Sequence, residues 1–177
     1  KTHLPALARD RTYLRAWSVG CSDGSELYSL ALVLHGMGLL DRSYLMGTDC
    51  RPNAITAAKR ALYQAEQVQG VPPGILAQHF RRTGDGYLVH PALRASVHWW
   101  IENALKPRET QATWDLICCR NMAMYLEASA AAALWHTLER ALRPGGLLIL
   151  GRAERPTAGR RFTQLEACIY RRDKGGI

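Results

Sequence analysis

The most informative stretch of the chain is Trp-Ser-Val-Gly-Cys-Ser-Asp-Gly-Ser-Glu-Leu-Tyr-Ser, residues 17–29. It follows a short apolar run, Tyr13 to Trp17, that predicts a strand, and it leads into an apolar-periodic run, Leu27 to Leu34, that predicts a helix. A strand, a glycine turn and a helix form the nucleotide-cradling unit of doubly wound α/β folds. A tight strand-to-helix turn without a ligand is the alternative that this stretch alone leaves open.

The two glycines of the turn, Gly20 and Gly24, would let the backbone approach a ligand without a Cβ in the way. Amide groups at the start of the helix would then face a polar group of that ligand. The spacing is Gly-x-x-x-Gly and differs from the Gly-x-Gly-x-x-Gly of dinucleotide sites, so it disfavours NAD and FAD.

A second ligand feature follows at the end of the next predicted strand. The run Ser43 to Thr48 is short and apolar and ends in Asp49. In this fold a carboxylate at the carboxyl end of the second strand accepts hydrogen bonds from two ribose hydroxyls. Asp49 could instead cap the helix that starts near Pro52, and it could serve both roles. Together with the glycine turn, it favours a cofactor that carries a nucleoside.

The composition is that of a globular protein with one domain. Hydrophobic residues make up 47% of the 177-residue chain and charged residues 21%. We expect no membrane insertion, because no apolar run approaches the roughly 18 residues that span a bilayer. The sequence has no signal-peptide pattern, and its five cysteines lack the paired spacing of a zinc site. These features predict free thiols in a reducing cytoplasm and no metal site.

The charge pattern argues against nucleic acid as a partner. The formal net charge is +8, yet the arginines are scattered and no aromatic ladder accompanies them.

Strands and helices alternate along the chain, which predicts an α/β fold: a doubly wound, mostly parallel sheet with helices on both faces. We expect helices at 4–9, 26–35, 53–63 and 128–142, strands at 13–17, 44–48, 97–101, 114–118 and 147–150, and a last strand or hairpin, antiparallel at the C-terminal edge, at 162–171. Residues 1–177 would form one domain with a small irregular or β excursion around 68–96, in which 87–89 is a short strand.

The chain resembles the S-adenosylmethionine-binding domain of CheR-type chemoreceptor glutamate methyltransferases, which have a Rossmann-like class I methyltransferase fold. The resemblance runs from about Leu14 to Arg172. It rests on the stretches 20–29 (GCSDGSELYS), 48–49 (TD), 102–105 (ENAL), 114–121 (WDLICCRN) with Tyr125, and 144–154 (PGGLLILGRAE). The Cys-Arg-Asn segment followed by a tyrosine is the most specific part.

The resemblance implies a role for each matching residue. Glu26 would be the acidic residue that contacts the cofactor, Asp49 the ribose carboxylate, and Asn103 the amide beside the adenine. The cofactor-binding set would be Gly20, Cys21, Ser22, Gly24, Glu26, Asp49, Cys50, Asn103, Ala104, Arg120 and Asn121, and the catalytic residues Tyr125 and Arg120. Packing at the start of the next helix is the alternative for Tyr125, and a structural salt bridge is the alternative for Arg120.

The implied function is methyl transfer from S-adenosylmethionine to glutamate carboxylates of a protein such as a chemoreceptor cytoplasmic domain, with S-adenosylhomocysteine as the product. Two alternatives remain: a non-catalytic S-adenosylmethionine-binding or scaffolding module, and a methyltransferase of this fold for another substrate. Family enzymes also carry an N-terminal helical domain that ends in a Phe-Phe-Arg segment. We therefore expect a missing N-terminal or partner domain.

Overall fold

A mostly parallel sheet forms the centre of the molecule. The computed structural model describes residues 2–9, 11–108, 111–156 and 161–174. Within them, a seven-stranded sheet has the order β6-β2-β1-β7-β8-β10-β9. Its strands are β1 (Leu14–Val19), β2 (Ser43–Asp49), β6 (Val97–Ile101), β7 (Trp114–Cys119), β8 (Leu142–Leu150), β9 (Phe162–Glu166) and β10 (Ile169–Arg172). Strand β10 is antiparallel to β8 and to β9, whereas the other pairs are parallel. The predicted doubly wound α/β sheet with an antiparallel C-terminal edge is confirmed.

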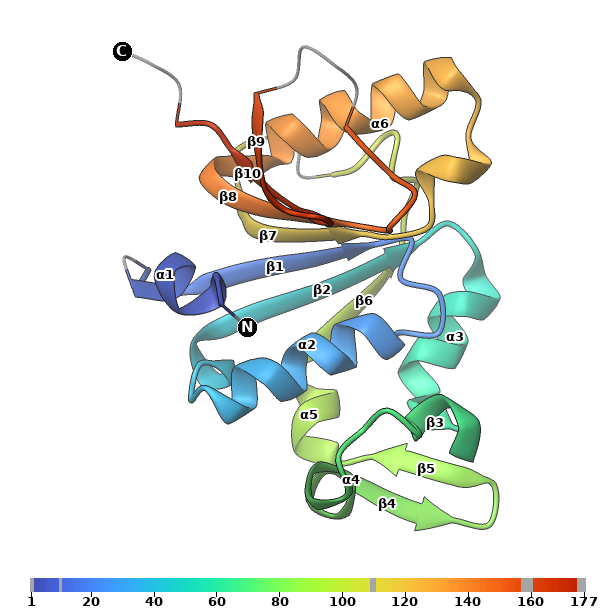
Figure 1. The fold of residues 1–177 in the computed structure, drawn as a ribbon. Coiled ribbons are helices and arrows are strands. Elements are labelled where there is room, and N and C mark those ends of the chain that lie inside the picture. The colour runs from blue at the N-terminus through green and yellow to red at the C-terminus, as the bar shows by residue number, and fades with distance from the viewer. Residues whose placement is uncertain (1, 10, 109–110, 157–160, 175–177) are drawn as a thin grey trace.

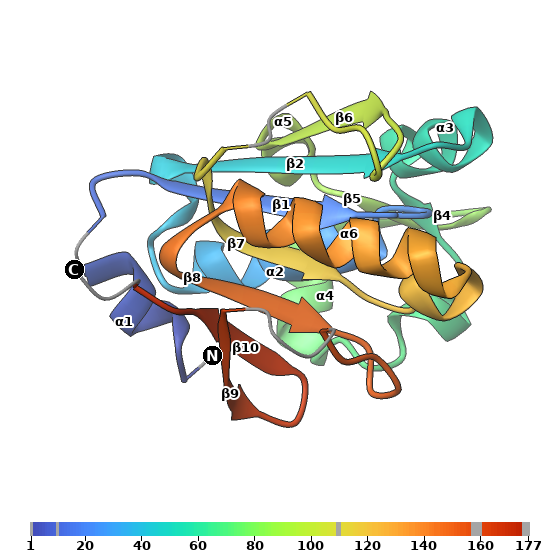
Figure 2. The same ribbon diagram turned by 90° about the horizontal axis from the view of Figure 1, so that it is seen from above.

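Helices cover both faces of this sheet (Figures 1 and 2). Helix α6 (Ala128–Ala141) lies on one face, and α1 (Leu4–Arg9) and α2 (Ser25–Gly36) lie on the other. The alternation of side chains along β1 explains the two layers. Leu14 and Ala16 pack into the apolar cluster that contains α2, whereas Trp17 and Val19 pack into the cluster that contains α6.

The excursion after α3 (Pro52–Arg60) is more regular than the sequence suggested. It contains a small antiparallel sheet of the order β3-β5-β4, with strands β3 (Leu62–Tyr63), β4 (Phe80–Thr83) and β5 (Gly86–Val89). The helices of this region are α4 (Pro73–His79), α5 (Pro91–Ala95) and the 3-10 turn η2 (Ala65–Val68). A proline at the first turn of α4 and of α5 starts a helix where the composition indicated only a turn.

The start of one predicted strand also differs from the prediction. Helix α6 passes directly into β8, which begins at Leu142 instead of 147. The Pro-Gly-Gly at 144–146 lies inside this strand, where the register with β7 shifts. A turn signal in the sequence therefore marks a bulge here.

No helix in the described ranges is both long and apolar enough to cross a membrane.

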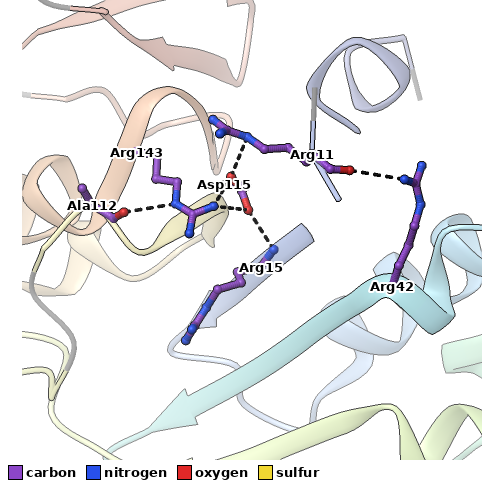
Figure 3. A network of polar contacts seen from close by, with 6 residues as sticks. All are labelled: Arg11, Arg15, Arg42, Ala112, Asp115 and Arg143. Atoms are coloured by element: carbon purple, nitrogen blue, oxygen red, sulfur yellow. Dashed lines mark hydrogen bonds and ion pairs between the residues drawn. The ribbon is translucent and has the colours of Figure 1, made fainter. Parts of the chain in front are cut away.

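A buried carboxylate ties the chain together at the amino edge of the parallel strands (Figure 3). Asp115, at the start of β7, has a fully buried side chain. It accepts a hydrogen bond from the backbone N–H of Arg15 at 2.9 Å and forms ion pairs with Arg11 at 3.1 Å and Arg143 at 3.2 Å. It thereby connects β7 with β1, with the segment before β1 and with β8.

The chain first adds strands on one side of β1 and then continues on its other side, so the sheet has a switch point between β1 and β7. Because β2 and β6 lie on one side of β1 while β7 and β8 lie on the other, the loops after β1 and β7 diverge. In open α/β sheets, ligands bind in the crevice that forms there, at the carboxyl ends of the strands.

We predict that Gly24→Ala destabilises the protein and that Gly36→Ala does not. Gly24 has φ 81°, and a Cβ on it would lie 2.6 Å from the Trp99 ring and 2.9 Å from the Ala58 Cβ. The left-handed conformation and the overlap together should cost about 2 kcal/mol or more of the free energy of unfolding. At Gly36, in the last turn of α2, a Cβ would meet no described atom within 4 Å outside its own helix. Urea unfolding of both variants measures the difference; equal stabilities would contradict the packing role of Gly24.

Candidate functional site

A cavity of about 580 Å³ opens at the carboxyl ends of β1, β2, β6 and β7. This volume lies within the range of small-molecule sites, about 300–1,000 Å³. The residues around it come from the loops after these strands and from the first turn of α2, and they are Gly20, Cys21, Ser22, Ser25, Glu26, Asp49, Cys50, Arg51, Glu102, Asn103, Ala104, Leu105, Arg120, Asn121, Met122, Tyr125 and Leu126.

The structure brings almost all of the sequence-predicted site residues to this cavity. The lining includes Gly20, Cys21, Ser22, Glu26, Asp49, Cys50, Asn103, Ala104, Arg120, Asn121 and Tyr125. Gly24 is the exception, because its backbone lies against Trp99 and Ala58 and it is absent from the lining. The second glycine of the turn therefore allows close packing of α2, α3 and β6.

The glycine turn is tied to the end of β2. Gly20 has φ 64°, and a Cβ there would come within 2.9 Å of the Met122 sulfur. Ser22 also has a left-handed backbone, with φ 50°. Its backbone N–H donates to an Asp49 oxygen at 3.0 Å, and the N–H of Cys21 donates to the carbonyl of Thr48 at 2.9 Å. These bonds hold the turn open beside the cavity.

Asp49 binds the neighbouring Arg51 in this structure. The backbone N–H of Arg51 donates to the carboxylate at 2.9 Å, and its side chain donates through Nε at 3.0 Å and Nη2 at 3.2 Å. Burial alone would raise the pKa of Asp49, but these hydrogen bonds and the one from Ser22 outweigh burial and lower it. The carboxylate is therefore ionised at neutral pH. The Arg51 side chain is mostly exposed, so a ligand can displace it.

Glu26 presents a second carboxylate, from the first turn of α2. Its Oε1 accepts a hydrogen bond from the Ser18 hydroxyl at 2.9 Å, and its Oε2 lies 3.4 Å from Nη1 of Arg120. Burial raises the pKa of Glu26 above its usual range, although the Ser18 hydroxyl and the Arg120 guanidinium oppose this. A partly buried carboxylate of this kind is suited to a cationic group of a ligand.

The loop after β6 forms the opposite wall. The Asn103 side-chain oxygen accepts the backbone N–H of Leu105 at 2.9 Å, which fixes the orientation of its amide. Ala104 is buried next to it. Leu105, together with Met122 and Leu126 from across the cavity, adds apolar surface. Apolar side chains with an amide beside them are suited to a planar base.

The loop after β7 supplies the side of the cavity nearest to solvent. Asn121 has φ 55°, and the 3-10 turn η3 (Ala123–Tyr125) follows it. Tyr125 is 80% exposed and Arg120 is about half exposed, so both can reach a second molecule at the mouth. This exposure argues against the alternative that Tyr125 packs at the start of the next helix. Arg120 does form the ion pair with Glu26 that was its structural alternative.

Three residues that contact the predicted site residues or hold the loop after β7 had no role assigned from the sequence. They are Arg51, which binds Asp49, Met122, which packs on the glycine turn, and Glu154, whose carboxylate binds backbone N–H groups of the loop after β7. Glu154 belongs to the quoted stretch 144–154, but no local pattern assigned a role to it.

Among the described residues there is no group of three or more His, Cys, Asp or Glu side chains that could hold a metal ion.

Comparison with known proteins gives a family match over most of the chain. Residues 2–170 match the family described as "CheR methyltransferase, SAM binding domain".

Relatives that are 31–32% identical cover four fifths or more of this chain. Identity is 32% to "Chemotaxis protein methyltransferase 1" of Pseudomonas aeruginosa, over 80% of this chain and 54% of that protein. Identity is also 32% to "Chemotaxis protein methyltransferase" of Listeria monocytogenes, over 87% of this chain and 59% of that protein. Identity is 31% to "Probable biofilm formation methyltransferase WspC" of Pseudomonas putida, over 80% of this chain and 34% of that protein. The chain thus spans 34–59% of the length of these curated relatives.

A solved structure shares the fold at low sequence identity. The "citrinin polyketide synthase CMeT domain" aligns with a TM-score of 0.51 and 16% identity, over 78% of this chain and 28% of that one. This likeness concerns the fold alone.

The residues around the cavity fit S-adenosylmethionine, the cofactor of the matched domain family. The cofactor carries a ribose diol, an adenine, an ammonium and a sulfonium. The cavity offers a carboxylate that already binds N–H donors at Asp49, an oriented amide at Asn103 and a second carboxylate at Glu26.

We predict that Asp49→Asn weakens the binding of S-adenosylhomocysteine on the order of tenfold to hundredfold, because a hydrogen bond to a charged group contributes about 1.5–3 kcal/mol. Arg51→Ala is the contrasting variant. It removes the side chain that competes for the same oxygens, so binding should be at least as tight as in the wild type. Isothermal calorimetry measures both, and wild-type affinity in Asp49→Asn would exclude this carboxylate from the site.

We predict that the binding of S-adenosylhomocysteine weakens as the pH is lowered. The weakening should begin at a higher pH than it would for a glutamate with its ordinary pKa, because the pKa of Glu26 is raised. The pKa of Glu26 is higher in the folded protein than in the unfolded chain. Glu26 therefore stabilises the fold at a pH below its pKa in the unfolded chain, and this contribution is lost as the pH rises through its pKa in the folded protein. Glu26→Gln should therefore unfold at a higher temperature than the wild type at pH 7 while it binds the ligand more weakly. Calorimetry and thermal unfolding from pH 4 to 8 measure both effects. If Glu26→Gln keeps the wild-type pH dependence of binding, another group is responsible.

Proposed function

Since the chain belongs to the CheR methyltransferase family and carries its S-adenosylmethionine-binding domain, we propose that it transfers a methyl group to glutamate carboxylates of a protein substrate. The cytoplasmic domain of a chemoreceptor is the proposed substrate, in keeping with the relatives named chemotaxis protein methyltransferases. We place the protein in the cytoplasm, where its five free cysteines would remain reduced.

The observation that carries this proposal is the convergence of one set of groups on a single cavity. Glu26, Asp49 and Asn103 (the inner groups) line it from the segments that follow β1, β2 and β6, while Arg120 and Tyr125 (the outer groups) line it from the segment after β7 and are exposed to solvent. The inner groups suit a nucleoside with a cationic tail, and the outer groups suit an anionic acceptor on a second molecule.

The inner residues would bind and orient the cofactor. In this proposal Asp49 accepts the ribose hydroxyls once Arg51 moves aside, and Asn103 pairs with an edge of the adenine. Gly20, Cys21 and Ser22 line the part nearest the methionine moiety, where Glu26 attracts the cationic groups. Cys50, Ala104 and Asn121 also line the cavity and carry no charge of their own.

The outer residues would act on the acceptor. The Arg120 guanidinium, shared with Glu26, can bind the incoming carboxylate and hold it toward the cavity. The exposed Tyr125 hydroxyl can donate a hydrogen bond to the same group. Both are proposed as catalytic residues because they would contact the reacting atoms.

The chemistry requires little beyond positioning. S-adenosylmethionine supplies a methyl carbon on a positively charged sulfur: the carboxylate oxygen bonds to this carbon while the sulfur–carbon bond breaks and its electron pair stays on sulfur. The acceptor is already ionised at neutral pH, so the protein needs no general base. Holding the two reactants in line within a dry pocket provides the rate enhancement.

A non-catalytic cofactor-binding module is the second candidate, because the same inner groups would serve it equally. Only the outer residues favour the enzyme. Nucleic acid is less suitable as a substrate, because no Asn-Pro-Pro-Tyr segment for methylation of base amines occurs in the sequence.

We predict that the full-length protein transfers labelled methyl groups from S-adenosylmethionine to a chemoreceptor cytoplasmic domain as base-labile esters. Tyr125→Phe should lower kcat about tenfold, the equivalent of one hydrogen bond in the transition state, and leave the affinity for S-adenosylhomocysteine unchanged. The assay measures the label released as methanol at high pH.

Met124→Ala is the matched control for the tyrosine. Met124 is also exposed on η3 and is absent from the cavity lining, so its loss should leave kcat unchanged. Cofactor binding without transfer to any receptor domain would favour the non-catalytic module. Label that resists base would exclude a methyl ester.

A further inference from the structure

One buried carboxylate outside the cavity binds the loop that lines it. Glu154 follows β8 and is 3% exposed. Its Oε2 accepts the backbone N–H groups of Asn121 at 2.7 Å and Gly151 at 2.9 Å. Its Oε1 accepts those of Met122 at 2.8 Å and Ala123 at 2.7 Å. Four main-chain donors thus converge on a single side chain.

These bonds hold a turn with an uncommon backbone conformation. Asn121 has the left-handed φ of 55°, so the N–H groups of three successive residues point to the same side. The bonded groups also begin the 3-10 turn η3, in which Tyr125 donates its N–H to the carbonyl of Met122. Glu154 therefore caps the turn that carries Tyr125, although it lies 29 or more positions further along the chain.

The chemistry of this contact requires a carboxylate. Two ionised oxygens can accept four hydrogen bonds, whereas the amide of glutamine has one oxygen and two N–H donors. In Glu154→Gln the amide nitrogen would face two of the four donors. The contact also requires a glycine at 151, because a Cβ there would lie 2.4 Å from the Asn121 side-chain oxygen and 2.7 Å from Glu154 Oε2.

The held segment supplies a large part of the site. Arg120, Asn121, Met122, Tyr125 and Leu126 all line the cavity. Met122 packs against the glycine turn, since its sulfur occupies the space that a Cβ on Gly20 would need. A shift of this loop would therefore move the catalytic residues and disturb the turn on the far wall.

We infer that Glu154 is a positioning residue: it fixes the loop 120–125 so that Arg120 and Tyr125 meet the acceptor and Met122 closes the cofactor cavity. The part of this inference that concerns transfer rests on the proposed function. The part that concerns the cavity rests on the contacts alone.

Glu154→Gln tests this with Asp115→Asn as the matched control. Asp115 is a fully buried carboxylate at the start of β7, the strand whose other end leads into the loop that Glu154 binds, and it also accepts a backbone N–H. Thermal unfolding, S-adenosylhomocysteine affinity by calorimetry, and kcat and KM for the receptor domain are measured for both, well below either unfolding temperature. We expect both to unfold earlier, but only Glu154→Gln to lose at least tenfold in affinity and tenfold in kcat.

Equal losses of affinity in both variants would overturn the inference, because they would show a general effect of removing a buried charge. Wild-type affinity and kcat in folded Glu154→Gln would overturn it as well. If the wild type transfers no methyl group, the proposed function fails, and the difference in affinity alone decides the role of Glu154. If Glu154→Gln does not fold, Gly151→Ala disturbs the same contact, and the same thresholds apply to it.

Discussion

Backbone N–H groups at the ends of the parallel strands bind buried carboxylates, and the positions of the connecting loops depend on these hydrogen bonds. A loop that leaves a strand loses its ladder partners, so its amides need other acceptors. Asp49 accepts the N–H of Ser22, and Glu154 accepts four N–H groups around the end of β7. Asp115 binds Arg15 in the same manner at the opposite edge. The shape of the cavity follows from the way the loops satisfy their own backbone.

Two of the three carboxylates that line the cavity, Asp49 and Glu26, have pKa values shifted in opposite directions. Arg51 neutralises Asp49 and lowers its pKa, whereas burial raises the pKa of Glu26 despite its contact with Arg120. Glu26 therefore costs stability at neutral pH until a cation arrives, and a positively charged ligand would recover part of that cost. A residue that lowers the stability of the fold is typical of a binding site, because stability and affinity make different demands on the same residues.

The fold and the inner site could be predicted because their signals are local. A glycine turn between a strand and a helix, and a carboxylate at the end of the next strand, place Glu26 and Asp49 together once the strands are parallel. The partner of Glu154 could not be predicted, because its contacts depend on how β7 and β8 pair. The packing of Gly24 against Trp99 could not be predicted either, because a glycine in a turn looks the same in sequence whichever way its free side faces.

The most direct test of a cofactor site at this sheet edge is a crystal structure of the protein with S-adenosylhomocysteine. The ribose hydroxyls should bind Asp49 in place of the Arg51 side chain, with the adenine beside Asn103 and the amino-acid end near Glu26. The loop 120–125 should keep its hydrogen bonds to Glu154. Ligand bound elsewhere, or an Asp49 that still binds the Arg51 side chain while the ribose lies apart from it, would contradict this account of the site.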